Sequence, residues 1–243
     1  MLEFIAEQVR GGTEVFIVSH KASAIVKMCS RVLWLDHGRL VEAIRAAGGR
    51  AEAGAHDVDA IAACDLLVVS PGIPPGAAVF QDARIAALPR VSELEFAARF
   101  LRARVVAITG TNGKTTVTSL IAHLLETAGI DVVAAGNIGL PVAEVARHDD
   151  QPEVVVVEAS SFQLAGIDTF DPEIGVVTNL APDHLDRYPD AATYYADKQR
   201  LFRNAHPSSR WVLNGDDAAV LALAGDVCGL RWCFTLNGPL PEG

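Results

Sequence analysis

Residues 109–116 read Thr-Gly-Thr-Asn-Gly-Lys-Thr-Thr and combine glycines with a lysine and hydroxyl groups. Glycine lets the backbone approach a phosphate closely, and a helix N-terminus directs free N–H groups toward it. Lys114 could reach the β- and γ-phosphates of ATP, and the Thr115 hydroxyl could ligate Mg²⁺. The alternative is a glycine turn before an ordinary helix, because the first glycine of the general P-loop pattern would fall at Ile108. The predicted ATP-binding residues are Gly110, Thr111, Asn112, Gly113, Lys114, Thr115 and Thr116.

A carboxylate lies at the end of a second apolar run. Glu158 closes the segment VVVVE, and open α/β sheets bind ligands at the carboxyl ends of their strands. A carboxylate buried there needs a partner, and Mg²⁺ would be one. The alternative is a strand-end glutamate that turns toward water.

A third polar group, TNLAPDHLDRY, occupies residues 178–188 and again follows an apolar run. It places His184 between Asp183 and Asp186, groups that bind metal or phosphate or transfer protons. A lone histidine is more often structural. The expected position of His184 at the same sheet edge as the phosphate loop favours a functional role.

Lys198 shares one face of a predicted helix over residues 191–205 with Tyr194, Leu201 and Phe202. A lysine on an apolar face either extends its ammonium group into water or has a pKa that burial lowers. Periodicity leaves both interpretations open. Asn137 also follows a predicted strand, but turn chemistry alone explains an asparagine between glycines.

The elements that would position these residues are short Val/Ile/Leu-rich runs that alternate with helical segments. Runs without polar alternation are typical of strands buried on both faces of a parallel sheet. The order predicts an α/β doubly wound fold. We predict strands over 14–19, 31–35, 65–70, 104–109, 131–135, 153–160, 173–179, 210–214 and 231–236, and helices over 21–30, 91–101, 114–128, 191–205 and 216–224.

Prolines divide the chain. Residues 71–90 contain four of them and predict little regular structure, so we place a domain boundary just after this segment. The predicted domains are a Rossmann-like domain over about 1–95 and a P-loop-type ATP domain over 96–243. Within the first, segments 14–19, 21–30 and 31–35 predict a β-α-β unit. We expect strand 14–19 or 31–35 to lie beside strand 65–70.

Composition excludes several classes of protein. The 243 residues include 20 Lys plus Arg and 30 Asp plus Glu, a net charge of −10 that disfavours nonspecific nucleic-acid or anionic-membrane binding. Cys29, Cys64, Cys228 and Cys233 form no CxxC pair, which disfavours a zinc or disulfide framework. No apolar run reaches the roughly 18 residues of a membrane helix. The start of the chain is unlike a secretory signal, so we expect a cytoplasmic protein.

The motifs, in their order, resemble the Mur ligases of peptidoglycan synthesis, most closely the branch that adds D-glutamate. The resemblance extends from about Glu42 to Gly243, and SSFQL with DHLDRYP favours that branch. The phosphate-loop motif alone also suits folylpolyglutamate synthases. The motifs that carry the resemblance are TGTNGKTT (109–116), GNIGLP (136–141), EASSFQL (158–164), TNLAPDHLDRYP (178–189) and YYADK (194–198).

The resemblance implies roles for individual residues. Lys114 and the amides of 113–116 would hold the ATP phosphates. A first Mg²⁺ would bind Thr115 and Glu158, and a second would be served by His184 and a carbamylated Lys198. The substrates would be a nucleotide sugar and D-glutamate, joined through an acyl phosphate. The implied catalytic residues are Lys114, Glu158, His184 and Lys198, and the implied nucleotide-sugar contacts are Ser70, Gly72 and Asn137.

Two departures from the family lead us to expect a truncated chain that is inactive alone. The family continues through adenine contacts and a C-terminal domain that this sequence does not match. Residues 1–42 instead resemble the end of an ABC-type ATPase, in which TEVFIVSH (13–20) matches the switch-histidine strand. An ABC ATPase is disfavoured because its other motifs are missing. A nucleotide-binding fragment without turnover and a folylpolyglutamate-synthase-like ligase remain the alternatives.

Overall fold

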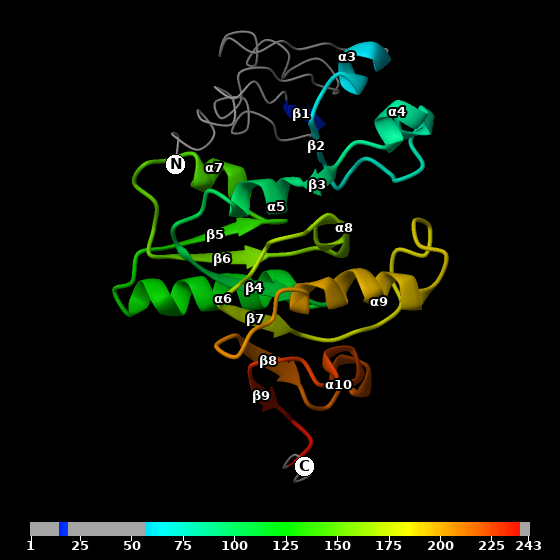
Figure 1. Cartoon of the computed structure of the whole chain (residues 1–243). Coiled ribbons are helices and arrows are strands. Elements are labelled where there is room, and N and C mark those ends of the chain that lie inside the picture. Colours follow the sequence, from blue (N-terminus) through cyan, green and yellow to red (C-terminus); the bar gives the residue numbers. More distant parts are fainter. Residues whose placement is uncertain (1–14, 19–56, 239–243) are drawn as a thin grey trace.

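The computed structural model describes residues 15–18 and 57–238, which contain two parallel sheets (Figure 1). The smaller sheet has the order β1-β2-β3 and lies at one end of the larger one. Val15 pairs with Leu66, and Val68 pairs with Val91. Its strands are β1 (Val15–Val18), β2 (Leu66–Val69) and β3 (Arg90–Ser92).

The pairing of β1 with β2 confirms the expectation that strand 14–19 or 31–35 lies beside strand 65–70, and strand 14–19 is the one that pairs. The predicted helix 21–30 and strand 31–35 lie outside the described residues, as does the rest of the ABC-like segment 1–42. The structure therefore tests one strand of the predicted β-α-β unit.

The larger sheet has six parallel strands in the order β5-β6-β4-β7-β8-β9. This arrangement confirms the predicted α/β class. Each of the six lies within a predicted strand or overlaps it, with ends that differ by two residues at most. The strands are β4 (Arg104–Thr109), β5 (Val132–Gly136), β6 (Val154–Glu158), β7 (Ile174–Val177), β8 (Arg210–Asn214) and β9 (Leu230–Phe234).

Helices pack on both faces of the larger sheet, which explains its continuous apolar strands. Alternate residues of β4 show the two faces. Val106 and Ile108 pack in a core with side chains of α6 (Lys114–Thr127). Ala107 packs in a second core on the other face. The helices that contribute to this second core are α5 (Glu93–Ala98), α7 (Val142–Ala146), α8 (Ser161–Ala165), the 3₁₀ helix η3 (Arg200–Phe202) and α10 (Ala218–Ala224).

Several predicted helix boundaries were wrong, two of them because a side-chain cap sets the first residue of the helix. The predicted helix 191–205 is α9 (Ala191–Gln199) followed by η3. The predicted helix 216–224 begins only after Asp217, whose carboxylate accepts hydrogen bonds from the amides of Ala219 and Val220. The predicted helix 91–101 contains the end of β3, because Ser92 caps α5 at its N-terminus.

The prediction of little regular structure over 71–90 was also wrong. This segment holds a 3₁₀ helix, η2 (Ala78–Gln81), and α4 (Ala83–Ala86), which Asp82 caps. Phe80 and Ile85 from these two elements pack against Ile61 of α3 (Val58–Ala62) in a small core under β2. Both elements lie between Pro75 and Pro89, in a stretch without proline, and burial of these apolar side chains stabilises them.

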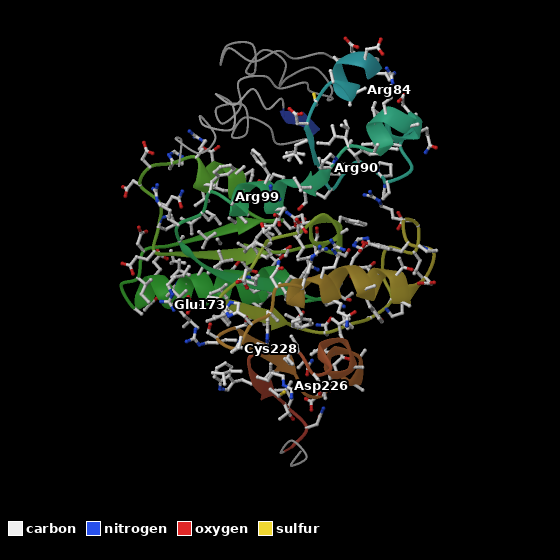
Figure 2. All side chains as sticks on the ribbon, in the orientation of Figure 1. Arg84, Arg90, Arg99, Glu173, Asp226 and Cys228 are labelled. Atoms are coloured by element: carbon white, nitrogen blue, oxygen red, sulfur yellow. The ribbon has the colours of Figure 1, made fainter. Side chains whose placement is uncertain are left out.

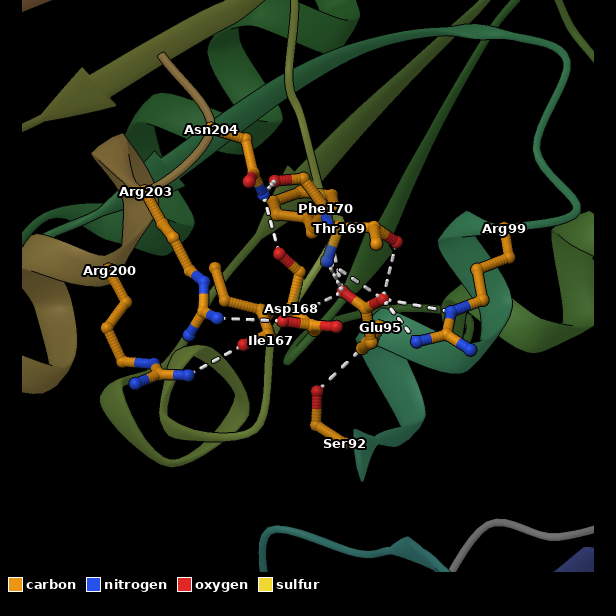
Figure 3. Close-up of polar contacts among 10 residues, drawn as sticks. All are labelled: Ser92, Glu95, Arg99, Ile167, Asp168, Thr169, Phe170, Arg200, Arg203 and Asn204. Carbon is orange, nitrogen blue, oxygen red and sulfur yellow. Dashed lines mark hydrogen bonds and ion pairs between the residues drawn. The ribbon is translucent and has the colours of Figure 1, made fainter. Parts of the chain in front are cut away.

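Glu95 of α5 ties the two sheets together (Figure 3). Its buried carboxylate accepts hydrogen bonds from the amides of Asp168, Thr169 and Phe170 and from the Thr169 hydroxyl. Burial alone would raise the pKa of Glu95, but these hydrogen bonds and Arg99 lower it below its usual value. The same loop is bonded to β3, because the Ser92 amide donates to the Gly166 carbonyl oxygen.

The predicted domain boundary near residue 95 falls within α5 and stays a prediction. Of the helices in the described part of the chain, none is long and apolar enough to cross a membrane.

Candidate functional site

The predicted phosphate loop connects the end of β4, a central strand, to the start of α6. Two of its glycines have backbone angles that favour glycine: Gly110 has φ of 141° and Gly113, which precedes the helix, has φ of 78°. A Cβ atom on Gly110 would lie 2.0 Å from the Thr178 hydroxyl oxygen. The loop therefore packs directly against the segment that follows β7, and only glycine fits at position 110.

The first-turn amides of α6 have no partner within the helix, as at any helix N-terminus. The amides of Thr111 and Asn112, by contrast, both donate hydrogen bonds to Asn179. Of the seven predicted ATP-binding residues, those from Gly113 to Thr116 thus supply the amides at the helix start, while Thr111 and Asn112 hold the loop to its neighbour.

Thr115 and Glu158 meet at the carboxyl edge of the sheet. The Thr115 hydroxyl donates to the Glu158 carboxylate over 2.7 Å, and the Asn137 amide nitrogen donates to its other oxygen over 2.8 Å. The Glu158 residue is 1% exposed. Asn137 is held in turn, because its backbone amide donates to the Glu158 carbonyl oxygen. The side chains of these three residues form one cluster beside the phosphate loop.

The donor chemistry of this cluster fits Mg²⁺. The buried Glu158 carboxylate accepts hydrogen bonds from a hydroxyl and an amide, both neutral, and a buried carboxylate is stable when a cation balances its charge. Mg²⁺ is typically held by one or two carboxylates together with phosphate oxygens of a substrate. Among the described residues no group of three His, Cys, Asp or Glu side chains converges, so the remaining ligands would come from the nucleotide and from water.

Lys114 curls back over the loop, where its ammonium nitrogen donates to the Thr111 carbonyl oxygen over 2.7 Å. Lys198 approaches the same loop from α9 and donates to the Gly110 carbonyl oxygen over 2.6 Å. The residue Lys198 is 1% exposed. Burial, with a contribution from the charge of Lys114, lowers the pKa of Lys198 to about 7. Of the two interpretations that helical periodicity left open, the structure excludes the one in which the ammonium group of Lys198 extends into water.

His184 and Lys198 both contact the ring of Tyr194. The Lys198 nitrogen lies 4.5 Å from the centre of that ring, and the His184 ring lies 5.9 Å from it. His184 has φ of 54°, a strained value for a residue other than glycine, and such strain often accompanies functional sites. The Asp183 carboxylate lies 3.7 Å from the His184 Nε2 atom.

A separate cavity of about 280 Å³ lies between the loop after β2 and the region of α8 and α9. Ser70 lines it, whereas Gly72 is exposed and its amide lies 3.5 Å from the Ser70 hydroxyl oxygen. Phe162 lines the cavity and also contacts the His184 ring at 5.1 Å. The structure therefore places Ser70 away from the phosphate loop but joins the two regions through one aromatic side chain.

Several residues that the sequence analysis did not select belong to these regions. Phe162 stacks on Tyr188 at 5.4 Å, and the Arg187 guanidinium lies 4.3 Å from the Phe162 ring centre. The Tyr188 hydroxyl donates to the Asp197 carboxylate, whose pKa burial raises. One signal could have revealed α8: Ser160 and Gln163 have the spacing of a capping box, which the structure contains. No comparable pattern points to Asn179.

Known proteins are similar to this chain in sequence. Residues 108–228 match the Mur ligase middle domain. The UDP-N-acetylmuramoylalanine--D-glutamate ligase of Desulfatibacillum aliphaticivorans is 41% identical over 198 residues, which are 82% of this chain and 44% of that protein. The ligases of the same name from Desulfosudis oleivorans and Pelotomaculum thermopropionicum are 42% and 40% identical over 92% and 94% of this chain. The chain spans 49% and 50% of their length.

Two solved structures share the fold. A UDP-N-acetylmuramate:L-alanyl-gamma-D-glutamyl-meso-diaminopimelate ligase from Neisseria meningitides superposes with a TM-score of 0.60 at 20% identity, over 91% of this chain and 78% of that one. A murein peptide ligase from Psychrobacter arcticus 273-4 superposes with a TM-score of 0.57 at 19% identity, over 91% of this chain and 53% of that one.

Proposed function

Because residues 108–228 form a Mur ligase middle domain and the chain therefore belongs to the Mur ligase family, we propose that it carries the ATP site of a ligase that adds D-glutamate to UDP-N-acetylmuramoyl-L-alanine. This reaction is part of peptidoglycan precursor synthesis, and we place it in the cytoplasm. The relatives at 40–42% identity are named as enzymes of this branch, which favours it over a folylpolyglutamate-synthase-like ligase. We also propose a substrate domain up to about residue 95 and an ATP domain from residue 96.

The observation that carries the proposal is the bond between Thr115 and the buried Glu158 carboxylate at the start of α6. It brings a hydroxyl and a charge-bearing ligand together where free amides of a helix N-terminus point outward. Lys114 stands in the same loop and can turn from the Thr111 carbonyl oxygen toward a phosphate. These groups suit the triphosphate of ATP, and Mg²⁺ bound there would neutralise charge on the β- and γ-phosphates.

In the proposed reaction these residues position and neutralise rather than form covalent bonds. The amides of 113–116 and the Lys114 ammonium group hold the γ-phosphate in line with the L-alanyl carboxylate of the acceptor, which attacks it and displaces ADP. The amine of D-glutamate then attacks the acyl phosphate, and phosphate leaves. We propose that His184 and a carbamylated Lys198 serve a second Mg²⁺ at this edge of the sheet.

For the nucleotide sugar we propose the cavity beside Ser70. It lies between the smaller sheet and the region of α8 and α9, and Arg90 and Arg187 contribute to its lining. Guanidinium groups suit the negative charges of such a substrate. Asn137 donates a hydrogen bond to Glu158 and therefore lies on the ATP side of the site. We propose that it contacts the reacting end of the nucleotide sugar.

Calorimetric titration with Mg·ATP tests the phosphate site. We expect Lys114→Ala to weaken binding about tenfold or more, because a hydrogen bond to a charged group contributes roughly 1.5–3 kcal/mol. Arg84→Ala is the control, since it removes an exposed cation of α4 that pairs with Asp59 and Asp82, on the far side of the smaller sheet (Figure 2). Equal affinities of the Lys114 variant and the parent would refute the proposed ATP site.

Phosphate release measures the ligase reaction itself. The assay contains UDP-N-acetylmuramoyl-L-alanine, Mg·ATP and D-glutamate. Stimulation by D-glutamate that disappears in Lys114→Ala would show that this chain performs the whole reaction. Mg·ATP binding without such stimulation would identify the chain as a nucleotide-binding fragment without turnover.

A further inference from the structure

We propose that Asn179 is a positioning residue that holds the phosphate loop in its binding shape. The inference rests on the proposed ATP site. Asn179 follows β7 and is 67 positions from Asn112 in the sequence, yet it binds the loop at three points. Its backbone carbonyl oxygen accepts from the Thr111 amide over 2.9 Å. Its side-chain oxygen accepts from the Asn112 amide, and its side-chain nitrogen donates to the Asn112 carbonyl oxygen, both over 2.9 Å.

These bonds divide the loop into a first part that Asn179 holds in place and a second part that remains available to bind phosphate. The amides of Thr111 and Asn112 are used by Asn179, so they are turned away from a phosphate. The amides that begin α6 have no such partner in the loop. Because Asn179 fixes the peptide groups just before Gly113, it sets the direction in which the following amides point. A loop without this contact would sample other conformations, and ATP binding would have to restrict them.

Asn179 can act as a rigid support because its own neighbours are fixed. The Thr178 amide donates to the Thr109 carbonyl oxygen at the end of β4. The Asn214 side chain donates to the Thr178 carbonyl oxygen over 2.9 Å, and the Leu180 amide donates to the Asp217 carboxylate over 2.8 Å. Asn179 thus transmits the geometry of two neighbouring strands, β7 and β8, to the loop after β4.

The pattern of bonds explains why an asparagine is suited to this position. Its side chain offers an oxygen to an N–H group and an N–H group to a carbonyl oxygen at the same time. An aspartate at position 179 would place a carboxylate oxygen against the Asn112 carbonyl oxygen and add a negative charge near the bound phosphates. Asn179→Asp should therefore weaken ATP binding more than Asn179→Ala does.

The experiment is titration of the full chain with Mg·ATP. We expect Asn179→Ala to weaken binding about tenfold, the effect of roughly 1.4 kcal/mol. Asn204→Ala is the matched control: Asn204 is also half-buried, and its side chain donates to the carbonyl oxygens of Asp168 and Phe170, away from the loop. Equal weakening by both alanine variants, or none by Asn179→Ala, would overturn the inference.

The variant Lys114→Ala distinguishes a failure of the proposed ATP site from a failure of the proposed role of Asn179. If Lys114→Ala binds Mg·ATP as the parent does, the proposed ATP site fails. If Lys114→Ala weakens binding and Asn179→Ala does not, only the role of Asn179 fails. In the Lys114→Ala background we expect Asn179→Ala to reduce the affinity for Mg·ATP less than it does in the parent, because both residues support the same contacts with the phosphates. A purely structural role of Asn179 would give the same loss in both backgrounds.

Hydrogen exchange of the nucleotide-free parent supplies a measurement that needs no variant. We expect the amides of Thr111 and Asn112 to be protected and those of the exposed residues at the start of α6 to exchange faster. In Asn179→Ala the protection at 112 should be lost, because the acceptor of that amide is the Asn179 side chain. Protection at 111, whose acceptor is the backbone carbonyl oxygen of residue 179, and protection of β4 should remain. Rapid exchange at both positions in the parent would contradict the proposal even if the alanine variant did not fold.

Discussion

The side-chain nitrogen of Lys198 lies 2.6 Å from the carbonyl oxygen of Gly110, the first residue after β4. One contact thus joins the helix after the His184 loop to the phosphate loop. Burial is the larger cause of the low pKa of Lys198, about 7, and the nearby Lys114 charge adds to it. A large fraction of the amine is therefore neutral at pH 7 to 8, which is the form that reacts with CO₂.

The pKa of Lys198 predicts how stability depends on pH. Because the pKa is about 7 in the folded chain and about 10.4 in an unfolded one, the unfolded chain binds one more proton between these values. The free energy of unfolding should therefore rise with pH from 7 to 10, by at most about 1.4 kcal/mol per unit. Urea unfolding of the parent and Lys198→Met isolates this contribution, which the variant lacks. Parallel pH curves for the two proteins would contradict it.

Gly110 should tolerate no side chain. A Cβ atom there would overlap the Thr178 hydroxyl at 2.0 Å, and φ of 141° is unfavourable for alanine. We expect Gly110→Ala to lower the free energy of unfolding by about 2–4 kcal/mol and to abolish Mg·ATP binding. The control is Gly76→Ala, since Gly76 is exposed with no heavy atom within 4 Å of its Cβ position. A Gly110 variant as stable as the Gly76 variant would show that the loop adapts.

Glu95 should contribute strongly to stability because its removal leaves the amides of residues 168–170, which are buried or partly buried, without their partner. We expect Glu95→Ala to lower the free energy of unfolding at pH 7 by about 3 kcal/mol or more. Glu173, a more exposed carboxylate that pairs with Arg104 and Arg210, provides the control, and its alanine variant should lose about 1 kcal/mol or less (Figure 2).

The lowered pKa of Glu95 adds a pH signature. A carboxylate whose pKa is depressed by folding stabilises the protein above its unfolded pKa, about 4.3, and this contribution disappears as the pH falls through the folded pKa. The difference between the parent and Glu95→Gln should therefore shrink below pH 4. A difference that stays constant from pH 7 to pH 3 would rule out this account.

Arg187 should affect the nucleotide sugar and leave ATP binding unchanged. Its guanidinium lies over the Phe162 ring at the edge of the cavity, away from the Thr115–Glu158 contact. We expect Arg187→Ala to weaken UDP-N-acetylmuramoyl-L-alanine binding about tenfold, since a charge-assisted bond is lost. Titrations with the nucleotide sugar and with Mg·ATP measure the two affinities separately. Equal weakening of both would place Arg187 in the ATP site.

Local patterns were sufficient to predict much of this molecule. The strand, glycine loop and helix around Lys114 lie together in the sequence, so their geometry follows from short-range rules. The same holds for the buried runs of the larger sheet. Short elements escaped prediction: α7 and α8 each have five residues, and β3 has three, too few for a period to show. These elements form because side chains cap them and because the folded chain makes apolar contacts that no short segment makes alone.

The sequence by itself determined the α/β class, the phosphate loop and the residue types available at the strand ends, because these depend on neighbours within a few positions. Only the tertiary structure decided which distant residues meet. It brought Asn179 to Asn112, the Lys198 nitrogen to Gly110 and Glu95 to the loop at 168–170. The physical reason is that strand order and helix packing set these contacts, and burial of the whole core, rather than any local preference, stabilises that arrangement.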